Sequence, residues 1–196
     1  MATANRGRAS NPDWDALFEI AQGQAGYFTT RQAASAGYSP QLLAYFGSKK
    51  VERIRRGIHR LVHFPSGEHE DLVVLWLWSE ETGVFSHETA LALHDLSDVL
   101  PGKAHLTLPA TWRRRRLRLP SGLVLHFADV GDRDRTSVGA VPVTAPLRTL
   151  RDCIDTDVAP SLVHQAILQA RRRGLITVAE EAGLRKEHGE SRTAAR

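Results

Sequence analysis

Apolar residues recur at helical spacing in the first part of the chain, and short runs rich in glycine and polar residues interrupt them. The apolar stripe from Trp14 to Ala21 predicts a first helix, which ends at Gly23 or Gly26. The residues before this stripe show no apolar period, and we expect residues 1–12 to form a disordered arm. Folded structure is therefore expected to begin near residue 13.

Two further helices are predicted by their start signals. Thr29 and Gln32 have the spacing of a capping box, in which each side chain bonds the backbone N–H of the other residue, and a short helix should follow. Ser39 followed by Pro40 supplies an N-cap and a first helical residue, which predict a second helix that ends near Ser48. Two short helices joined by a tight turn are typical of a helix-turn-helix, whose second helix enters the major groove of DNA.

A β-hairpin is predicted directly after these helices. Residues 51–62 contain two β-prone runs hinged on Gly57, and the first run carries three arginines. A basic hairpin after the second helix of such a motif is typical of a winged helix. A turn signal rich in proline, serine and glycine follows, so we expect a winged-helix domain over residues 13–66.

The rest of the chain mixes helical and β-type patterns. The predicted elements are helices over 71–79, from Ser86, over 146–154 and over 160–173, and strands over 105–108, 123–127 and 141–143. Because Pro142 cannot donate to a sheet ladder, we expect its strand at a sheet edge. The predicted fold class is α+β: an N-terminal winged helix-turn-helix, then a C-terminal α+β domain over 67–185, and a polar tail over 186–196.

Charge is unevenly distributed along the chain, although the net charge is only +4. Residues 1–66 hold nine basic and four acidic groups, whereas residues 67–158 hold ten and fourteen. Within 26–63, seven basic groups accompany Glu52 as the single acidic group. Concentrated positive charge favours a polyanionic partner, and together with the helix-turn-helix pattern it predicts binding to double-stranded operator DNA.

The predicted DNA contacts differ in role. Gln41, Tyr45 and Ser48 should project from the exposed face of the second helix and reach base edges, since an amide can pair bidentately with adenine. The neighbouring lysines and Arg31 should grip phosphates, and the hairpin arginines should contact the backbone or a narrow minor groove. The full set of predicted DNA-binding residues is Thr30, Arg31, Gln32, Ser39, Gln41, Tyr45, Ser48, Lys49, Lys50, Arg53, Arg55, Arg56 and Arg60.

Four stretches of the chain occur in an order that is typical of one protein family. They are YFTTRQAASAGYSPQLLAYFGSKKVERIRRGIHRL, FSHETALALHDL, KAHLTLP and VPVTAPLRTLRDCID. Their succession resembles the AbiEi antitoxin family of transcriptional regulators. The resemblance implies a DNA-binding winged helix and a C-terminal α+β domain associated with antitoxin activity. It also implies a repressor of its own operon that counteracts a nucleotidyltransferase-like toxin in type IV toxin–antitoxin and phage-defence systems.

Catalytic and metal-binding patterns are not found in the sequence. His87-Glu88 has Leu91 where the zinc-binding His-Glu-x-x-His motif requires a second histidine. Cys153 is the single cysteine, so an internal disulfide and a cysteine-based zinc site are both excluded. His105 and His126 show no triad pattern, although residues distant in sequence can meet in space. We therefore expect no enzyme activity, no catalytic residue, no cofactor and no metal.

Two other functions remain open from the sequence. A nuclease-type enzyme with a fused winged helix would need carboxylates and a lysine around a metal, but residues 67–158 contain only Lys103 as lysine. An interaction-only antitoxin would use the winged helix to bind protein. The run Arg113–Arg116 fits a solvated strand edge slightly better than a second DNA contact or a docking patch, so we leave it out of the DNA site.

Location and assembly are weakly constrained by the sequence. The longest apolar run, Leu72–Trp78, is much shorter than the ~20 residues that cross a bilayer, and the first residues lack the apolar centre of a signal peptide. We therefore expect a cytoplasmic protein with no membrane contact. The protein could occupy DNA as a monomer or as a dimer, since no heptad pattern decides between them.

Overall fold

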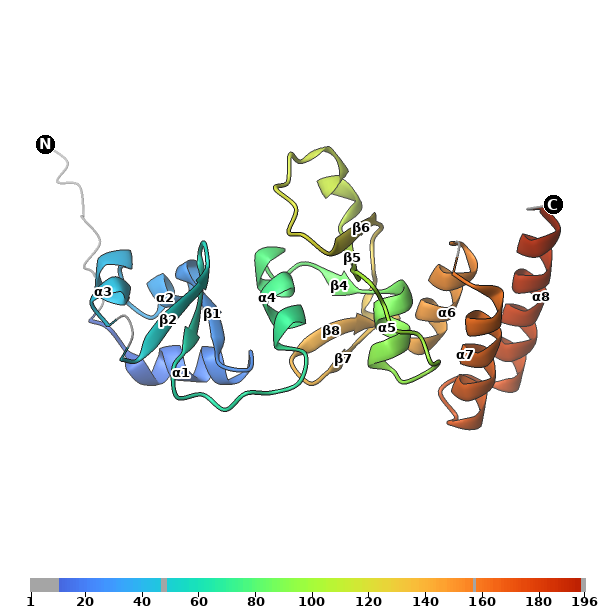
Figure 1. Ribbon diagram of the computed structural model, residues 1–196, viewed down its shortest axis with the longest axis horizontal. Helices are drawn as coiled ribbons and strands as arrows, with labels where there is room; N and C mark the ends of the chain where they lie inside the picture. Colours follow the sequence, from blue (N-terminus) through green and yellow to red (C-terminus); the bar gives the residue numbers. More distant parts are fainter. Residues whose placement is uncertain (1–10, 47–48, 157, 195–196) are drawn as a thin grey trace, which may run out of the picture. The chain divides into compact units, whose positions relative to one another are not determined.

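The computed structural model describes residues 11–46, 49–156 and 158–194 (Figure 1). The chain divides into two compact units, Met1–Trp78 and Ser79–Arg196. The expected arm over 1–12 lies outside the described residues except for residues 11 and 12. Within the described part of the chain, no helix has the length and hydropathy needed to span a membrane.

The first unit is a helical domain with a small antiparallel sheet. Its elements are α1 (Trp14–Gln22), β1 (Tyr27–Thr29), α2 (Thr30–Ser35), α3 (Pro40–Tyr45), β2 (Val51–Arg55), β3 (Ile58–Leu61) and α4 (Glu70–Trp78). The strand order is β1-β3-β2, so the predicted hairpin is present and gains a third strand. The sequence analysis missed β1 because three residues are too short to show an alternating pattern.

Both predicted start signals are confirmed. The Thr29 hydroxyl accepts from the backbone N–H of Gln32, and the Gln32 side chain accepts from the backbone N–H of Thr29 at 2.8 Å, which completes the capping box of α2. Ser39 caps α3, and Pro40 is its first residue. Helix α3 ends at Tyr45, earlier than expected, and the predicted end at Ser48 lies outside the described residues.

The core of the first unit lies between the helices and one face of the sheet. Leu17 of α1, Phe28 of β1 and Leu43 of α3 are buried together there. Gly26 precedes the sheet at a φ of +86°, and a Cβ at this position would lie 2.5 Å from the Phe64 ring. The turn into β1 therefore requires glycine, both for its backbone angle and for the close approach of Phe64.

Helix α4 belongs to the first unit, whereas the sequence analysis placed the domain boundary before it, after residue 66. Helix α4 is held to the first unit by hydrogen bonds that converge on the carboxylate of Glu70. The carboxylate of Glu70 accepts from the Tyr27 hydroxyl at 2.8 Å, from the Arg60 guanidinium at 3.1 Å and from the backbone N–H of Gly67 at 2.8 Å. These bonds attach α4 to β1 and β3, and we call Glu70, Tyr27, Arg60 and Gly67 the α4 clasp.

The described residues of the second unit form a mixed sheet and four α-helices. Its elements are β4 (Val84–Phe85), α5 (His87–Leu93), β5 (Ala104–Leu108), η1 (Ala110–Arg114), β6 (Leu123–Phe127), η2 (Asp132–Asp134), β7 (Arg135–Val138), β8 (Val141–Thr144), α6 (Pro146–Ile154), α7 (Pro160–Arg172) and α8 (Val178–Ala194). The strand order is β6-β5-β4-β8-β7. Helices α6, α7 and α8 pack against one another (Figure 1) and bury Cys153, Ile167 and Leu184. The α+β fold class is confirmed.

Two expectations for this unit are wrong in detail. The strand with Pro142 is not at an edge, because β8 lies between β4 and β7. The proline is tolerated because β4 pairs with β8 only at Phe85 and Val143, which leaves no ladder on that side for Pro142 to interrupt. The polar segment from residue 186 continues α8 to Ala194, anchored by the buried Leu184 and by an Arg185–Glu181 ion pair one turn apart.

Candidate nucleic-acid interface

Helix α3 presents a polar face to solvent. Leu43 is buried on its inner side, whereas Gln41 and Tyr45 are exposed, and Tyr45 has 82% of its surface accessible. Residues four apart on a helix share a face, so Gln41 and Tyr45 point the same way. The structure thus leaves these two predicted base-reading side chains accessible, and the third, Ser48, lies outside the described residues.

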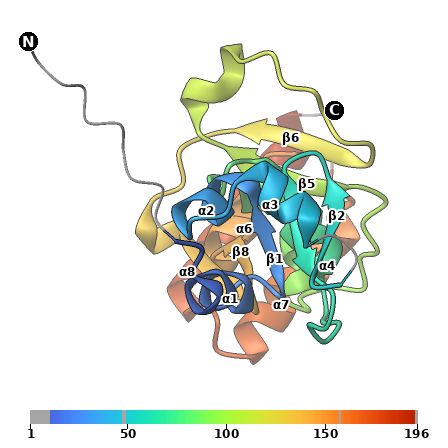
Figure 2. The same ribbon diagram turned by 90° about the vertical axis from the view of Figure 1, so that its left-hand side faces the viewer.

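A hollow of about 440 Å³ separates α3 from the hairpin. Figure 2 shows α3 and β2 next to each other on the face of the first unit that is turned to the viewer. The hollow is lined by Thr30, Pro40, Leu43, Ala44, Val51, Arg53, Gly57 and His59. Of the predicted wing arginines, Arg53 is therefore the one placed beside α3.

A β-bulge divides the wing arginines between the two faces of the hairpin. Arg53 pairs with His59, and Arg55 pairs with Ile58, so Ile54 is the extra residue of β2. Because neighbouring residues of β3 point to opposite sheet faces, Arg53 and Arg55 also lie on opposite faces. The sequence analysis gave the hairpin arginines one shared role and assigned no register, so the separation of Arg53 from Arg55 comes from the structure alone.

The wing cations are available for an external anion. Arg53, Arg55 and Arg56 are exposed, and none of them forms an ion pair with a carboxylate among the described residues. The Nε of Arg53 donates to the backbone carbonyl of Arg55 at 3.4 Å, which orients the Arg53 side chain along the hairpin. Within the part of the chain that the structure describes, these guanidinium groups therefore have no carboxylate that would compete with an external anion.

The cations near α3 differ from one another in environment. Lys49 and Arg31 are exposed. Lys50 lies with its Nζ 4.7 Å from the centre of the Trp14 ring and 5.8 Å from that of Phe46, a cation–π arrangement that restricts the lysine side chain. These three residues give the helix side of the motif its positive charge.

Four of the predicted contact residues are engaged inside the unit instead. The Gln32 amide donates to the side-chain oxygen of Gln24 at 2.9 Å in addition to its capping bond, and the Ser39 hydroxyl caps α3. Thr30 bonds the Nε2 of His59 at 3.1 Å. Arg60 has 12% of its side chain exposed and binds Glu70. These side chains hold the helices and strands of the first unit in place. For Gln32 and Ser39, the sequence analysis had also predicted a helix-capping role.

His59 is a site residue that the sequence analysis missed. It stacks on Phe28 with ring centres 5.6 Å apart and lines the hollow beside α3. Burial lowers the pKa of His59, and the neighbouring Arg53 lowers it further. The ring is therefore neutral at pH 7 and contributes hydrogen bonding and packing to the hollow without charge.

The run Arg113–Arg116 is not a strand edge, because Arg113 and Arg114 lie in the 3-10 helix η1. The guanidinium of Arg115 lies 3.8 Å from the centre of the buried Trp112 ring and 3.8 Å from the Glu80 carboxylate. Arg113 donates to the backbone carbonyl of Phe127 at 3.2 Å. These two arginines hold η1 against its surroundings, whereas Arg114 and Arg116 are exposed.

Comparison with known proteins supplies the family context for this geometry. Residues 15–62 match the model of the family described as "Transcriptional regulator, AbiEi antitoxin". The AbiEi match runs from α1 through β3, so it covers the helix-turn-helix and the wing. It confirms the resemblance over the first of the four stretches named in the sequence analysis, and the other three lie outside the matched residues. Residues 15–62 are thus similar to the corresponding part of AbiEi transcriptional regulators, and the match covers about a quarter of the chain.

Comparisons over the full chain give less information. No curated protein sequence matches this chain. Among solved structures, the crystal structure of the RV2827C protein from Mycobacterium tuberculosis matches with a TM-score of 0.40 and 13% sequence identity, covering 91% of this chain and 83% of that one.

Proposed function

We propose that this protein is a DNA-binding transcriptional repressor of the AbiEi type, which binds double-stranded operator DNA through α3 and the β2–β3 hairpin. One observation carries the proposal: the polar face of α3 is exposed beside a hairpin in which Arg53, Arg55 and Arg56 have no carboxylate partner among the described residues, whereas Arg60 pairs with Glu70. A recognition helix needs an accessible polar face, and a wing needs free cations. The match of residues 15–62 to AbiEi regulators supports this assignment.

The proposed contacts divide into base contacts and phosphate contacts. Gln41 and Tyr45, with Ser48 beyond them, are proposed to read base edges in the major groove. Phosphates are proposed to be bound by Arg31, Lys49, Lys50, Arg53, Arg55 and Arg56. Thr30, Gln32, Ser39 and Arg60 are left out of the contact set because their side chains bind within the unit.

Binding to DNA from the protein's own upstream region, measured by fluorescence anisotropy against a scrambled duplex, tests this proposal. Gln41→Ala should lose about 1–3 kcal/mol of preference for the operator, because one base contact is removed. Arg53→Ala and Arg55→Ala should weaken binding to both duplexes alike, because phosphates carry no sequence information. Arg172→Ala, which removes an exposed arginine from α7, is the matched control and should bind as the wild type does.

The proposal fails if the wild type shows no preference for any upstream duplex. It also fails if Arg172→Ala weakens binding as much as Arg53→Ala does, because net charge and not the wing would then be responsible. Copurification with a partner protein in the absence of DNA binding would instead favour an interaction-only antitoxin.

The second unit is proposed to bind a nucleotidyltransferase-like toxin. The protein itself is proposed to have no enzyme activity. It is also proposed to be cytoplasmic and to make no membrane contact. These points rest on the AbiEi resemblance, which links the C-terminal domain to antitoxin activity. Coexpression with such a toxin should relieve growth inhibition and yield a copurifying complex. Light scattering of the DNA complex should distinguish a bound monomer from a bound dimer.

A further inference from the structure

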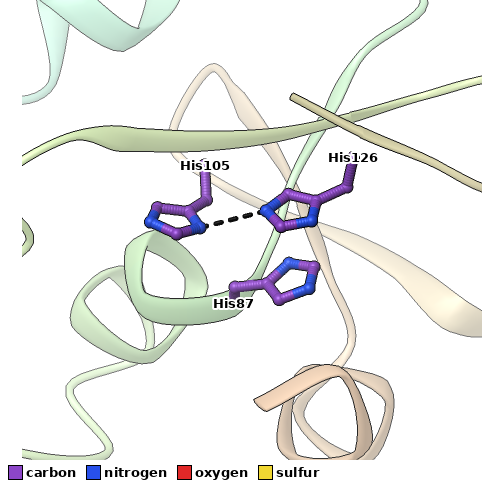
Figure 3. Close-up of side chains that lie close together, drawn as sticks. All are labelled: His87, His105 and His126. Atoms are coloured by element: carbon purple, nitrogen blue, oxygen red, sulfur yellow. Dashed lines mark hydrogen bonds between the residues drawn. The ribbon is translucent and has the colours of Figure 1, made fainter. Parts of the chain in front are cut away.

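Three histidines from separate parts of the second unit converge on one point (Figure 3). His87 begins α5, His105 lies on β5, and His126 lies on β6. Strands β5 and β6 run parallel with His105 opposite Val124, so His126 lies two residues further along on the same sheet face. The start of α5 brings the third imidazole to this face.

The distances place one nitrogen of each ring within reach of a shared centre. The Nδ1 of His105 lies 3.0 Å from the Nε2 of His126, and one nitrogen from each of the three rings lies within 4.8 Å of the others. His87 stacks on His126 with ring centres 3.6 Å apart and an interplanar angle of 15°. Two nitrogen ligands of one tetrahedral zinc ion, each at about 2.0–2.1 Å from the metal, lie about 3.3 Å apart, which is close to the separation of the His105 and His126 nitrogens.

Oxygen atoms support the ring nitrogens that face away from this centre. The Nδ1 of His87 is bonded to the Ser86 hydroxyl at 2.8 Å, which leaves its Nε2 for another partner, and Ser86 is bonded to Thr107 at 2.7 Å. The Nε2 of His105 lies 3.8 Å from the Glu88 carboxylate. Metal-binding histidines commonly have such an oxygen partner on the second nitrogen, because it fixes the orientation of the ring.

His87 also has a costly backbone conformation. Its φ is +52°, in the left-handed region that non-glycine residues rarely adopt, and its side chain is buried. Strain of this kind clusters at functional sites. The hydrogen bond between His105 and His126 does not require the His87 ring, so it does not account for the strained backbone of His87.

We propose that His87, His105 and His126 form a binding site for one divalent transition-metal ion of the Zn²⁺ class. Imidazole nitrogen suits zinc, and three protein ligands leave a fourth position for water or a small anion. Binding requires the His87 ring to rotate from its stacked position, because stacked rings cannot direct both nitrogens at one ion. The ion would then link α5, β5 and β6, which are separated in sequence, and stabilise the second unit.

Titration of the untagged full-length chain with Co²⁺, followed by visible absorption and by displacement with Zn²⁺, tests this proposal. We expect one Co²⁺ per chain, visible bands typical of a low-coordinate nitrogen site, and a higher Tm with Zn²⁺. His105→Gln and His126→Asn should weaken binding by at least about tenfold, because each removes a ligand. His164→Asn is the matched control, since His164 is exposed on α7 in the same unit, and it should bind as the wild type does.

Ser86→Ala keeps all three imidazoles and tests the site even where a histidine variant fails to fold. Loss of the hydroxyl that orients His87 should weaken Zn²⁺ binding by about 10–100-fold, the usual effect of removing a supporting partner. Circular dichroism at each step reports whether the variants are folded. The proposal is overturned if the wild type binds neither Co²⁺ nor Zn²⁺ saturably, or if folded His105→Gln and His126→Asn variants bind as tightly as His164→Asn.

Discussion

Two glutamines of the first unit show how context decides the role of a residue. Gln32 is half-buried, accepts from the Thr29 backbone and bonds Gln24. Gln41 is exposed on α3, where no partner inside the unit competes for its amide among the bonds that the structure describes. The first glutamine therefore stabilises the helix pair, and the second is suited to an external ligand.

Substitution of the two glutamines should separate stability from recognition. Gln32→Ala should lower the free energy of unfolding by about 1–2 kcal/mol, because the capping bond and the partner of Gln24 are lost. Gln41→Ala should leave stability within about 0.5 kcal/mol of the wild type, since it is a surface change. Urea unfolding followed by circular dichroism measures both. If Gln41→Ala lowers the free energy of unfolding as much as Gln32→Ala does, Gln41 also stabilises the fold and the proposed separation of roles is wrong.

At the scale of elements, the α4 clasp joins a helix to two strands through one carboxylate. The hydrogen bond from Gly67 is the main cause that lowers the pKa of Glu70, and the bonds from Tyr27 and Arg60 lower it further. Burial and the bond to Glu70 raise the pKa of Tyr27 to about 12. The clasp is therefore strongest with Glu70 ionised and Tyr27 neutral.

The clasp should give the first unit a pH-dependent stability. Because the folded pKa of Glu70 lies below its ordinary value of 4.5, its contribution is complete above pH 4.5 and is lost as the pH falls further. Because the folded pKa of Tyr27 is raised, its contribution is complete below pH 10 and is lost towards pH 12. Glu70→Gln should lower the free energy of unfolding by about 1–3 kcal/mol at neutral pH.

Urea unfolding of wild type and Glu70→Gln at about pH 7 and about pH 3 measures this contribution. The difference in the free energy of unfolding between the two proteins should shrink at the lower pH, because the contribution of the ionised Glu70 carboxylate is lost progressively as the pH falls below 4.5. Asp71→Asn, which removes the adjacent exposed carboxylate of α4, is the matched control and should show little change at either pH. If the two proteins differ in free energy of unfolding as much at low pH as at neutral pH, the charge of the Glu70 carboxylate does not stabilise the clasp.

At the scale of the whole molecule, positive charge is concentrated in one segment of the chain and does not distinguish the two units, which carry nine basic and seven acidic groups and seventeen basic and fifteen acidic groups. Residues 1–66 carry nine basic and four acidic groups, whereas residues 67–158 carry ten and fourteen. Six of the basic groups in the first segment are proposed phosphate contacts. The proposed DNA complex therefore depends on a local concentration of charge and not on the modest net charge of the chain.

Salt should weaken DNA binding steeply. If about six phosphates are neutralised, the logarithm of the binding constant should fall with the logarithm of salt concentration with a slope near −5. Arg53→Ala should make this slope shallower by about one. Anisotropy titrations over a range of NaCl concentrations measure both slopes. A binding constant that hardly changes between low and moderate salt would contradict phosphate-dominated binding.

The sequence predicts those parts of the fold that depend on neighbours along the chain. Thr29 and Gln32 are close in sequence, so their capping box could be identified from spacing alone, as could the hinge at Gly57. The attachment of α4 depends on Glu70 meeting Tyr27 across a long stretch of chain, which leaves no local signal. The meeting of His87, His105 and His126 also leaves no local signal: parallel pairing of β5 with β6 brings His105 and His126 together, and the start of α5 brings His87 to them.

The bulge at Ile54 has a consequence for how the hairpin would lie on a duplex. A regular strand with alternate arginines would direct all of its charge at one sugar-phosphate strand. With Arg53 and Arg55 on opposite faces, the ribbon carries guanidinium groups on both sides. If this ribbon enters a groove in the proposed complex, its arginines can contact the sugar-phosphate strands on both sides of the groove. The extra residue Ile54 would thus change a contact with one DNA strand into a contact with both.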